Sequence, residues 1–139
     1  MAFVVDATIF AAWCFSDERT PYAETTLNAL MHQNVVVPTL WWFESRNILI
    51  GHELRGRIRA DDSNFFIRYM DKLPIQTDHD LQNDSVTRIA RKGGLSYFEA
   101  CYLEVAHRRG IPLATLNKKL AHVSVSEGVS LFTDNTIAA

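Results

Sequence analysis

Short apolar runs alternate along this chain with longer stretches of helical spacing. Residues 3–5 and 35–37 are continuous apolar runs, the pattern of strands that are buried on both faces of a sheet. Each run is followed by apolar residues that recur at every third or fourth position, which is typical of a helix packed on one side. Strands that alternate with helices predict a parallel sheet with helices on both of its faces.

The same alternation continues to the C-terminus. After a first helix that begins near Ile9, we expect helices over residues 22–31, 39–54, 61–72, 78–92 and 96–109, and a short one from residue 117. Further short strands are expected at residues 73–76, 111–115 and 129–132. These elements predict the α/β class, a three-layer α/β/α arrangement with a central parallel sheet of four to five strands. The 139 residues fit one domain, 1–139.

Composition and charge exclude several classes of protein. The net charge of −2 argues against a strongly basic, non-specific DNA binder, although it leaves room for local basic patches. Two cysteines are too few for a disulfide framework and favour a reducing compartment. The N-terminus lacks the basic start of a secretion signal, and no apolar stretch reaches the ~18 residues needed to span a bilayer. We therefore expect a cytoplasmic protein with no membrane association.

Three acidic residues occupy comparable places in the predicted fold. Asp6 ends the first strand, Glu44 lies in the first turns of the helix after the second, and Glu99 lies in the first turn of the helix before the strand at 111–115. If the first strand is central, all three meet at the carboxyl edge of the sheet. Carboxylates brought that close repel one another unless a cation separates them, and hard oxygen ligands favour Mg²⁺ or Mn²⁺. Such an ion suits metal-assisted hydrolysis of a phosphodiester.

Each of these residues also has a simpler interpretation. Asp6 is a favoured residue for capping the helix that follows it, and Asn117 is likewise a helix cap. Ser96-x-x-Glu99 is a capping box, in which the glutamate accepts from the backbone N–H of the cap residue. Glu44 is explained equally by a side chain that reaches from a buried face to the rim. Their shared placement at strand ends, rather than any one residue, carries the metal-site hypothesis.

Four segments together resemble the motifs of PIN-domain nucleases, and in particular the VapC toxins of type II toxin–antitoxin pairs. They are, in order, Val4-Val-Asp6-Ala-Thr8, Val37-Pro38 with Trp42-Phe-Glu44, Leu95-Ser-Tyr-Phe-Glu99-Ala100, and Leu113-Ala-Thr115-Leu-Asn117-Lys-Lys-Leu120. The resemblance implies a PIN-like fold and a Mg²⁺- or Mn²⁺-dependent endoribonuclease that cuts an RNA substrate. It also implies a homodimer, or a hetero-oligomer with a cognate antitoxin that blocks the acidic site.

The resemblance also implies roles for individual residues. The family's first Asp falls on Asp6 and its helix Glu on Glu44, while the third and fourth acidic positions, usually Asp, fall on Glu99 and Asn117. Asp6, Glu44 and Glu99 are thus the expected metal ligands, and with Asn117 they form the expected catalytic set. Glu99 keeps the charge but adds a methylene, and Asn117 removes a charge, which should weaken affinity for a divalent ion.

An RNA substrate needs positive charge beside an acidic site, because backbone phosphates supply much of the affinity. The candidates are Arg46 on the helix of Glu44, and Lys118 and Lys119 directly after Asn117, with Thr115 as a further substrate contact. A solvated face explains the two lysines equally well. The five histidines show no close pairing, which argues against a histidine-based zinc site.

The aromatic residues leave two interpretations open. They either line a groove for an antitoxin helix or a dimer partner, or belong to the core, and the residues concerned are Trp13, Trp41, Trp42, Phe65 and Phe66.

Two further functions compete with the nuclease hypothesis. A catalytically weak or inactive PIN-like protein would bind RNA or antitoxin without turnover, because of the changes at Glu99 and Asn117. A phosphoryl-transfer domain would use Asp6 as a nucleophile, but Thr8 stands where such haloacid-dehalogenase-like enzymes usually have a second Asp.

Overall fold

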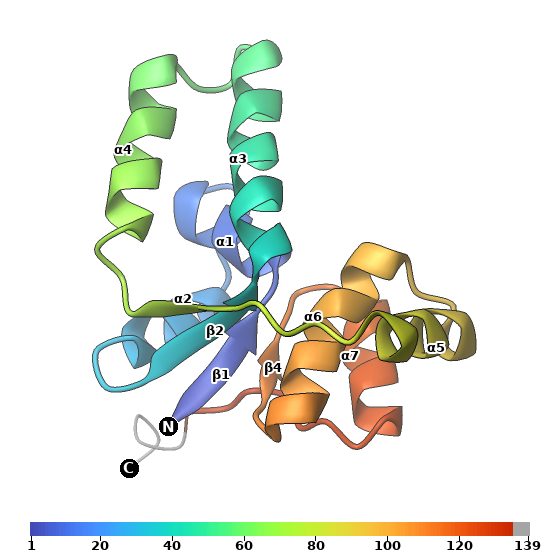
Figure 1. Ribbon diagram of the computed structural model, residues 1–139. Helices are drawn as coiled ribbons and strands as arrows, with labels where there is room; N and C mark the ends of the chain where they lie inside the picture. Colours follow the sequence, from blue (N-terminus) through green and yellow to red (C-terminus); the bar gives the residue numbers. More distant parts are fainter. Residues whose placement is uncertain (135–139) are drawn as a thin grey trace.

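The computed structural model describes residues 1–134 and contains a four-stranded parallel sheet in the order β3-β2-β1-β4 (Figure 1). The strands are β1 (Ala2–Val5), β2 (Asn34–Pro38), β3 (Ile75–Asp78) and β4 (Leu113–Ala114). Val4 pairs with Val36 on one side and with Leu113 on the other. The first strand is therefore central, as the metal-site hypothesis requires, and its carboxyl end lies between those of β2 and β4.

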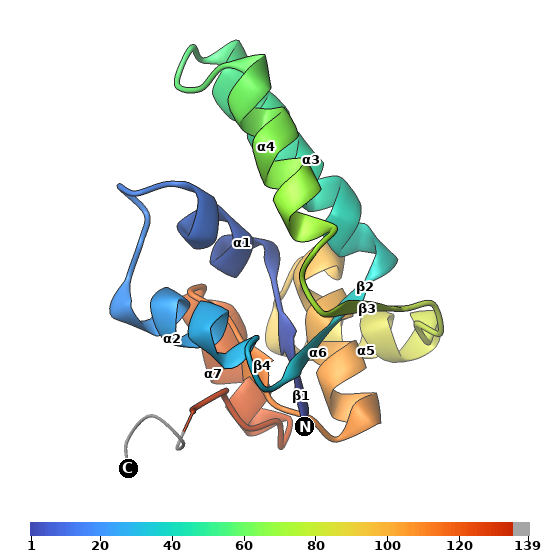
Figure 2. The same ribbon diagram turned by 90° about the vertical axis from the view of Figure 1, so that its left-hand side faces the viewer.

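Helices cover both faces of the sheet. They are α1 (Ala7–Cys14), α2 (Pro21–Ala29), α3 (Thr39–Leu54), α4 (Ala60–Met70), α5 (Asn83–Gly93), α6 (Tyr97–Arg109) and α7 (Lys118–Ser126). On one side α6 contacts β1, β2 and β4, and α5 packs against α6. Figure 2 shows α1 and α2 on the opposite side of the sheet from α5 and α6. The three-layer α/β/α fold is thus confirmed, and α3 and α4 form a hairpin that extends beyond the sheet. In residues 1–134, no helix has both the length and the apolar character needed to cross a membrane.

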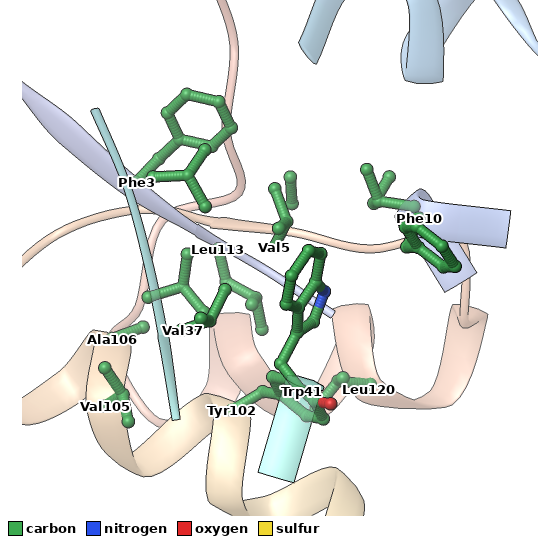
Figure 3. Packing of buried hydrophobic residues seen from close by; sticks show 14 of the residues in the cluster. Phe3, Val5, Phe10, Val37, Trp41, Tyr102, Val105, Ala106, Leu113 and Leu120 are labelled. Carbon is green, nitrogen blue, oxygen red and sulfur yellow. The ribbon is translucent and has the colours of Figure 1, made fainter. Parts of the chain in front are cut away.

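The core explains why the first strands are uniformly apolar. Phe3, Val4 and Val5 are fully buried, because the flanking helices cover both faces of the central strand. Figure 3 shows residues of the sheet packed with side chains of α3 and α6. Trp41, near the start of α3, is also fully buried, and its indole N–H donates to the backbone carbonyl of Asp6 at 3.3 Å. This bond fixes the start of α3, and hence the helix that carries Glu44, against the end of β1.

Three of the expected elements differ from the structure. The helix expected from residue 78 begins at Asn83, and the strand expected at 73–76 lies at Ile75–Asp78, because Asp78 pairs with Pro38 as the last residue of β3. The strand expected at 129–132 is reduced to a single parallel bridge between Leu113 and Leu131, since β4 offers only two residues for pairing.

Asp78 joins the edge of the sheet to the C-terminal end of α6. Its carboxylate is buried and accepts hydrogen bonds from Arg108, at 2.8 and 3.1 Å, and from Arg109. Arg108 also donates to Glu104 at 2.7 Å. Burial opposes ionisation of Asp78, but the two guanidinium groups and the backbone N–H of Asp80 outweigh it and hold the pKa of this carboxyl well below its ordinary value.

We predict that this cluster makes stability depend on pH. A carboxyl whose pKa is lower in the folded state stabilises the fold above its ordinary pKa of about 4, and loses that contribution as pH falls toward the folded-state pKa. Asp78→Asn should therefore lower the free energy of unfolding in urea by about 3 kcal/mol at pH 7. The difference from the wild type should shrink steadily below about pH 4. An equal difference at pH 7 and pH 3 would contradict the assignment.

Candidate active site

Asp6 lies at the carboxyl end of β1 and caps α1. Its Oδ1 accepts hydrogen bonds from the backbone N–H groups of Thr8 and Ile9, at 3.1 and 3.2 Å, and from the Thr8 hydroxyl at 2.6 Å. Its Oδ2 accepts from the hydroxyl of Thr115, which directly follows β4. The capping interpretation is therefore correct, and the same carboxylate also reaches a segment 109 positions away.

Burial dominates the electrostatics of Asp6. The side chain is only 4% exposed, and burial raises its pKa, although the hydrogen bonds from Thr115, Thr8 and Ile9 act in the opposite direction. Each of these donors is neutral. An ionised carboxylate in such a place gains stability from any positive charge brought beside it.

Glu44 is held by a residue of α6, which lies on the other side of the sheet from α1. It is half-buried on α3, and its Oε1 accepts a hydrogen bond from the hydroxyl of Tyr102 on α6. Tyr102 is buried, and burial together with this hydrogen bond raises the pKa of its phenol, so the group stays protonated and donates. Sequence reasoning missed Tyr102 as a site residue. The available signal was its position three residues after Glu99, which puts both on one face of the helix.

Glu99 and Asn117 form a closed pair. Glu99 Oε1 accepts from the backbone N–H of Ser96 at 2.8 Å, which completes the capping box at the start of α6. Its Oε2 accepts from the side-chain amide of Asn117, whose own oxygen caps α7 by accepting from the N–H of Leu120 at 3.1 Å. The backbone N–H of Ser96, then the amide of Asn117 and the charge of Lys119, lower the pKa of Glu99 despite partial burial. Both capping interpretations are therefore correct.

One cavity of about 220 Å³ brings the four expected catalytic residues together. Its lining consists of Asp6, Ala7, Thr8, Glu44, Ser96, Phe98, Glu99, Tyr102, Asn117 and Leu120. These residues come from the start of α1, from α3, from α6 and from the start of α7 (Figure 1). The convergence expected from strand order is thus present at the carboxyl edge of the sheet.

The donors of this cavity fit a hard cation in their chemistry. Asp6, Glu44 and Glu99 offer carboxylate oxygens, which Mg²⁺ and Mn²⁺ prefer. In residues 1–134 no three His, Cys, Asp or Glu side chains are grouped closely enough to hold a metal ion as they stand. Each of the three carboxylates accepts a hydrogen bond from a neutral group of the protein. The donors are Tyr102 for Glu44, Thr115 for Asp6 and Asn117 for Glu99. Asn117 uses its oxygen for the cap of α7, which leaves the acidic side chains as the available ligands.

The candidate substrate residues lie in different surroundings. Arg46 is half-buried, donates to the carbonyl of Trp42 at 3.2 Å and lies over the ring of that residue. Lys118 and Lys119 are exposed at the start of α7, and the charge of Lys119 acts on Glu99. The buried hydroxyl of Thr115 donates to Asp6. Contact of these four residues with a substrate stays a prediction.

Comparison with known proteins connects this geometry to one family. The family model described as PIN domain matches residues 3–126, which include all four residues of the expected catalytic set. Ribonuclease VapC3 of Pyrobaculum aerophilum is 27% identical over 125 residues, covering 87% of this chain and 93% of the relative.

Two solved structures share the fold. VapC20 of Mycobacterium tuberculosis, described as a sarcin-ricin loop cleaving toxin, has a TM-score of 0.60 at 12% identity, covering 86% of this chain and 93% of the other. VapBC2 of Rickettsia felis, bound to a DNA fragment from its promoter, has a TM-score of 0.66 at 9% identity, covering 95% and 98%. At these identities the likeness concerns the fold, whereas the family match spans most of the sequence. This chain belongs to the PIN domain family.

Proposed function

We propose that this protein is a metal-dependent endoribonuclease that hydrolyses RNA phosphodiester bonds and acts as the toxin of a type II toxin–antitoxin pair. The observation that carries the proposal is the cavity that Asp6, Glu44 and Glu99 line together. Membership of the PIN domain family supports it, as does the similarity to a relative named as a ribonuclease. A structural neighbour described as a sarcin-ricin loop cleaving toxin points the same way.

Asp6, Glu44 and Glu99 are the residues that would hold Mg²⁺ or Mn²⁺. When bound, such an ion activates water and neutralises charge on the phosphodiester under attack. The protein supplies rigid placement of the ligands: Asp6 is fixed by the start of α1 and by Thr115, and Glu44 is fixed by Tyr102. Thr115 acts on the substrate through the carboxylate that it orients.

Basic residues near the cavity complete the substrate site. Lys118 and Lys119 are exposed at the start of α7, next to Asn117, and bind RNA phosphates close to the acidic edge. Arg46, which lies over Trp42 on α3, binds phosphate farther along the RNA, outside the cavity.

The partners proposed here are a cognate antitoxin and a second copy of the chain, in the cytoplasm, with residues 1–139 acting as one domain. An apolar pocket of about 260 Å³ supports the partner hypothesis, because Trp13, Phe65, Phe66 and Tyr69 line it together with residues of α1, α2 and α4. Phe65 is 59% exposed there, whereas Trp41 is fully buried in the core. The neighbour VapBC2 and the neighbour FitAcB of Neisseria gonorrhoeae give further support by their shared fold.

A second candidate function is a PIN-domain protein that binds RNA or antitoxin with little turnover. The observation that favours it is the bond from Asn117 to Glu99, which occupies one carboxylate oxygen with an amide, while the capping box occupies the other. Cleavage assays separate the two functions, because a binding protein retains RNA without cutting it.

The first test is removal of the central acids. Asp6→Asn and Glu44→Gln should each lower the rate of RNA cleavage in Mg²⁺ or Mn²⁺ by at least about 100-fold, because each removes a charge from the metal site. Asn is also a good cap, so Asp6→Asn should still fold. Rates on a structured RNA, together with urea unfolding, measure both expectations.

A matched control is Asp71→Asn, which removes an exposed carboxylate at the end of α4 and should leave cleavage unchanged. Induced expression in a bacterial host should arrest growth with the wild type and the control only. RNA binding without cleavage by the wild type would favour the second function. Equal cleavage by all variants would refute the acidic site.

The second test restores the family's usual residue at the fourth position. Asn117→Asp keeps the cap of α7 but places a carboxylate against Glu99 Oε2, where like charges repel until a cation separates them. Calorimetric titration should show Mn²⁺ binding at least about 10-fold tighter than in the wild type. Asn83→Asp, exposed at the start of α5, is the control and should leave Mn²⁺ affinity unchanged. Unchanged Mn²⁺ affinity in Asn117→Asp would show that this pair lies outside the metal site.

A further inference from the structure

A second and larger compartment lies beside the acidic cavity. Its volume is about 480 Å³, and it shares Ala7 and Thr8 with the acidic cavity. The remaining lining consists of Ala11, Glu18, Ile48, His52 and Leu116. The two spaces therefore have a common wall at the start of α1, immediately after Asp6.

Helical spacing explains why the compartment exists. Glu44, Ile48 and His52 follow one another at intervals of four along α3, so they form one line on a single face of that helix. Ala7 and Ala11 have the same spacing on α1, which contacts α3 (Figure 1). Because these two side chains are only methyl groups, space remains between the helices. The line from Glu44 to His52 is about 12 Å long at 1.5 Å per residue.

The two ends of this line differ in chemistry. At the far end the His52 ring is buried and stacked on Phe15, with ring centroids 3.9 Å apart, and its Nδ1 lies 2.9 Å from the carbonyl of Ile48. The guanidinium of Arg57 lies 3.1 Å from Nε2 of the same ring, and Glu18 lies 3.7 Å from it. The middle is apolar, through Ala11, Ile48 and Leu116. An apolar slot thus lies between the carboxylate cluster and a polar end, where Arg57 is ion-paired with Asp17 and Glu18 lies beside His52.

We propose that this compartment receives an unpaired RNA base from the nucleotide next to the cleaved phosphodiester. The inference rests on the proposed function and adds a binding site to it. Proteins that bind single-stranded RNA hold splayed bases against apolar and aromatic side chains, and the backbone against positive charge. The slot offers the first through Ile48 and Leu116, and the exposed Lys118 and Lys119, which directly follow Asn117 of the acidic cavity, offer the second.

The compartment suits a nucleotide better than a protein side chain, because the compartment adjoins the acidic cavity. A phosphodiester seated at Asp6 and Glu44 necessarily carries a nucleoside on each side. The acidic cavity and this compartment share Ala7 and Thr8 in their lining. A base next to that phosphodiester therefore lies within reach of the slot, along the start of α1.

A substitution that fills the slot with a larger side chain tests the inference and leaves Asp6, Glu44 and Glu99 unchanged. The probes are a fluorescent single-stranded RNA octamer and the same octamer without bases, bound in metal-free buffer and followed by anisotropy. The wild type should prefer the base-bearing octamer by at least about 10-fold. Ala11→Leu should reduce that preference by about 10-fold and leave affinity for the abasic octamer unchanged. Ala60→Leu, an exposed position on α4, is the matched control and should keep the wild-type preference.

A second variant and a second assay keep the outcomes distinct. Ile48→Ala removes the apolar wall and should lower the base preference by about 5-fold, which serves if Ala11→Leu does not fold. Hydrolysis of bis(p-nitrophenyl) phosphate with Mn²⁺ reports on the acids alone, and wild type and Ala11→Leu should be equal in it. Absence of this hydrolysis in both proteins would refute the proposed function, while the binding assay would still decide the base site. An unchanged base preference in both slot variants would overturn the inference and leave the compartment to a protein partner.

Discussion

The buried carboxylate of Asp6 is the point on which the rest of this structure depends. One oxygen fixes the first turn of α1, and the other is bound by Thr115, so a single side chain joins the end of β1 to the segment that follows β4. The backbone carbonyl of the same residue accepts from Trp41 and brings in α3. The helix that carries Glu44 and the segment that leads to Asn117 are therefore positioned around Asp6 by its own hydrogen bonds. Fold and site share one set of interactions.

The acidic groups around the cavity are not equivalent. Burial raises the pKa of Asp6, whereas hydrogen bonds and a nearby lysine lower the pKa of Glu99. Glu44 is bound by a phenol that does not ionise. A cation brought into the cavity therefore gains most from Asp6, where no positive partner exists among residues 1–134. It gains less from Glu99, whose charge is already stabilised by the protein.

How much the sequence reveals depends on the separation between interacting residues. The buried strands β1 and β2 were predictable because their apolar runs are continuous, and the caps at Asp6, Ser96 and Asn117 were predictable because a cap acts on residues two or three positions away. Tyr102 and Glu44 are 58 positions apart, and Arg108 and Asp78 are 30 apart, so no local pattern connects them. The error at Asp78 has this origin, since only the distant arginines make a carboxylate acceptable at a buried strand end.

Each outer strand of the sheet carries a feature that limits further pairing. At β4, Leu113 donates to the carbonyl of Ser130 and accepts from the N–H of Phe132, so the C-terminal segment occupies that side. At β3, the carboxylate of Asp78 is bound by guanidinium groups of α6 at the last position of the strand. A β-strand from another molecule finds only a short ladder there and a charged cluster at its end. Open sheet edges are templates for aggregation, and these two features disfavour edge-to-edge association of the folded protein.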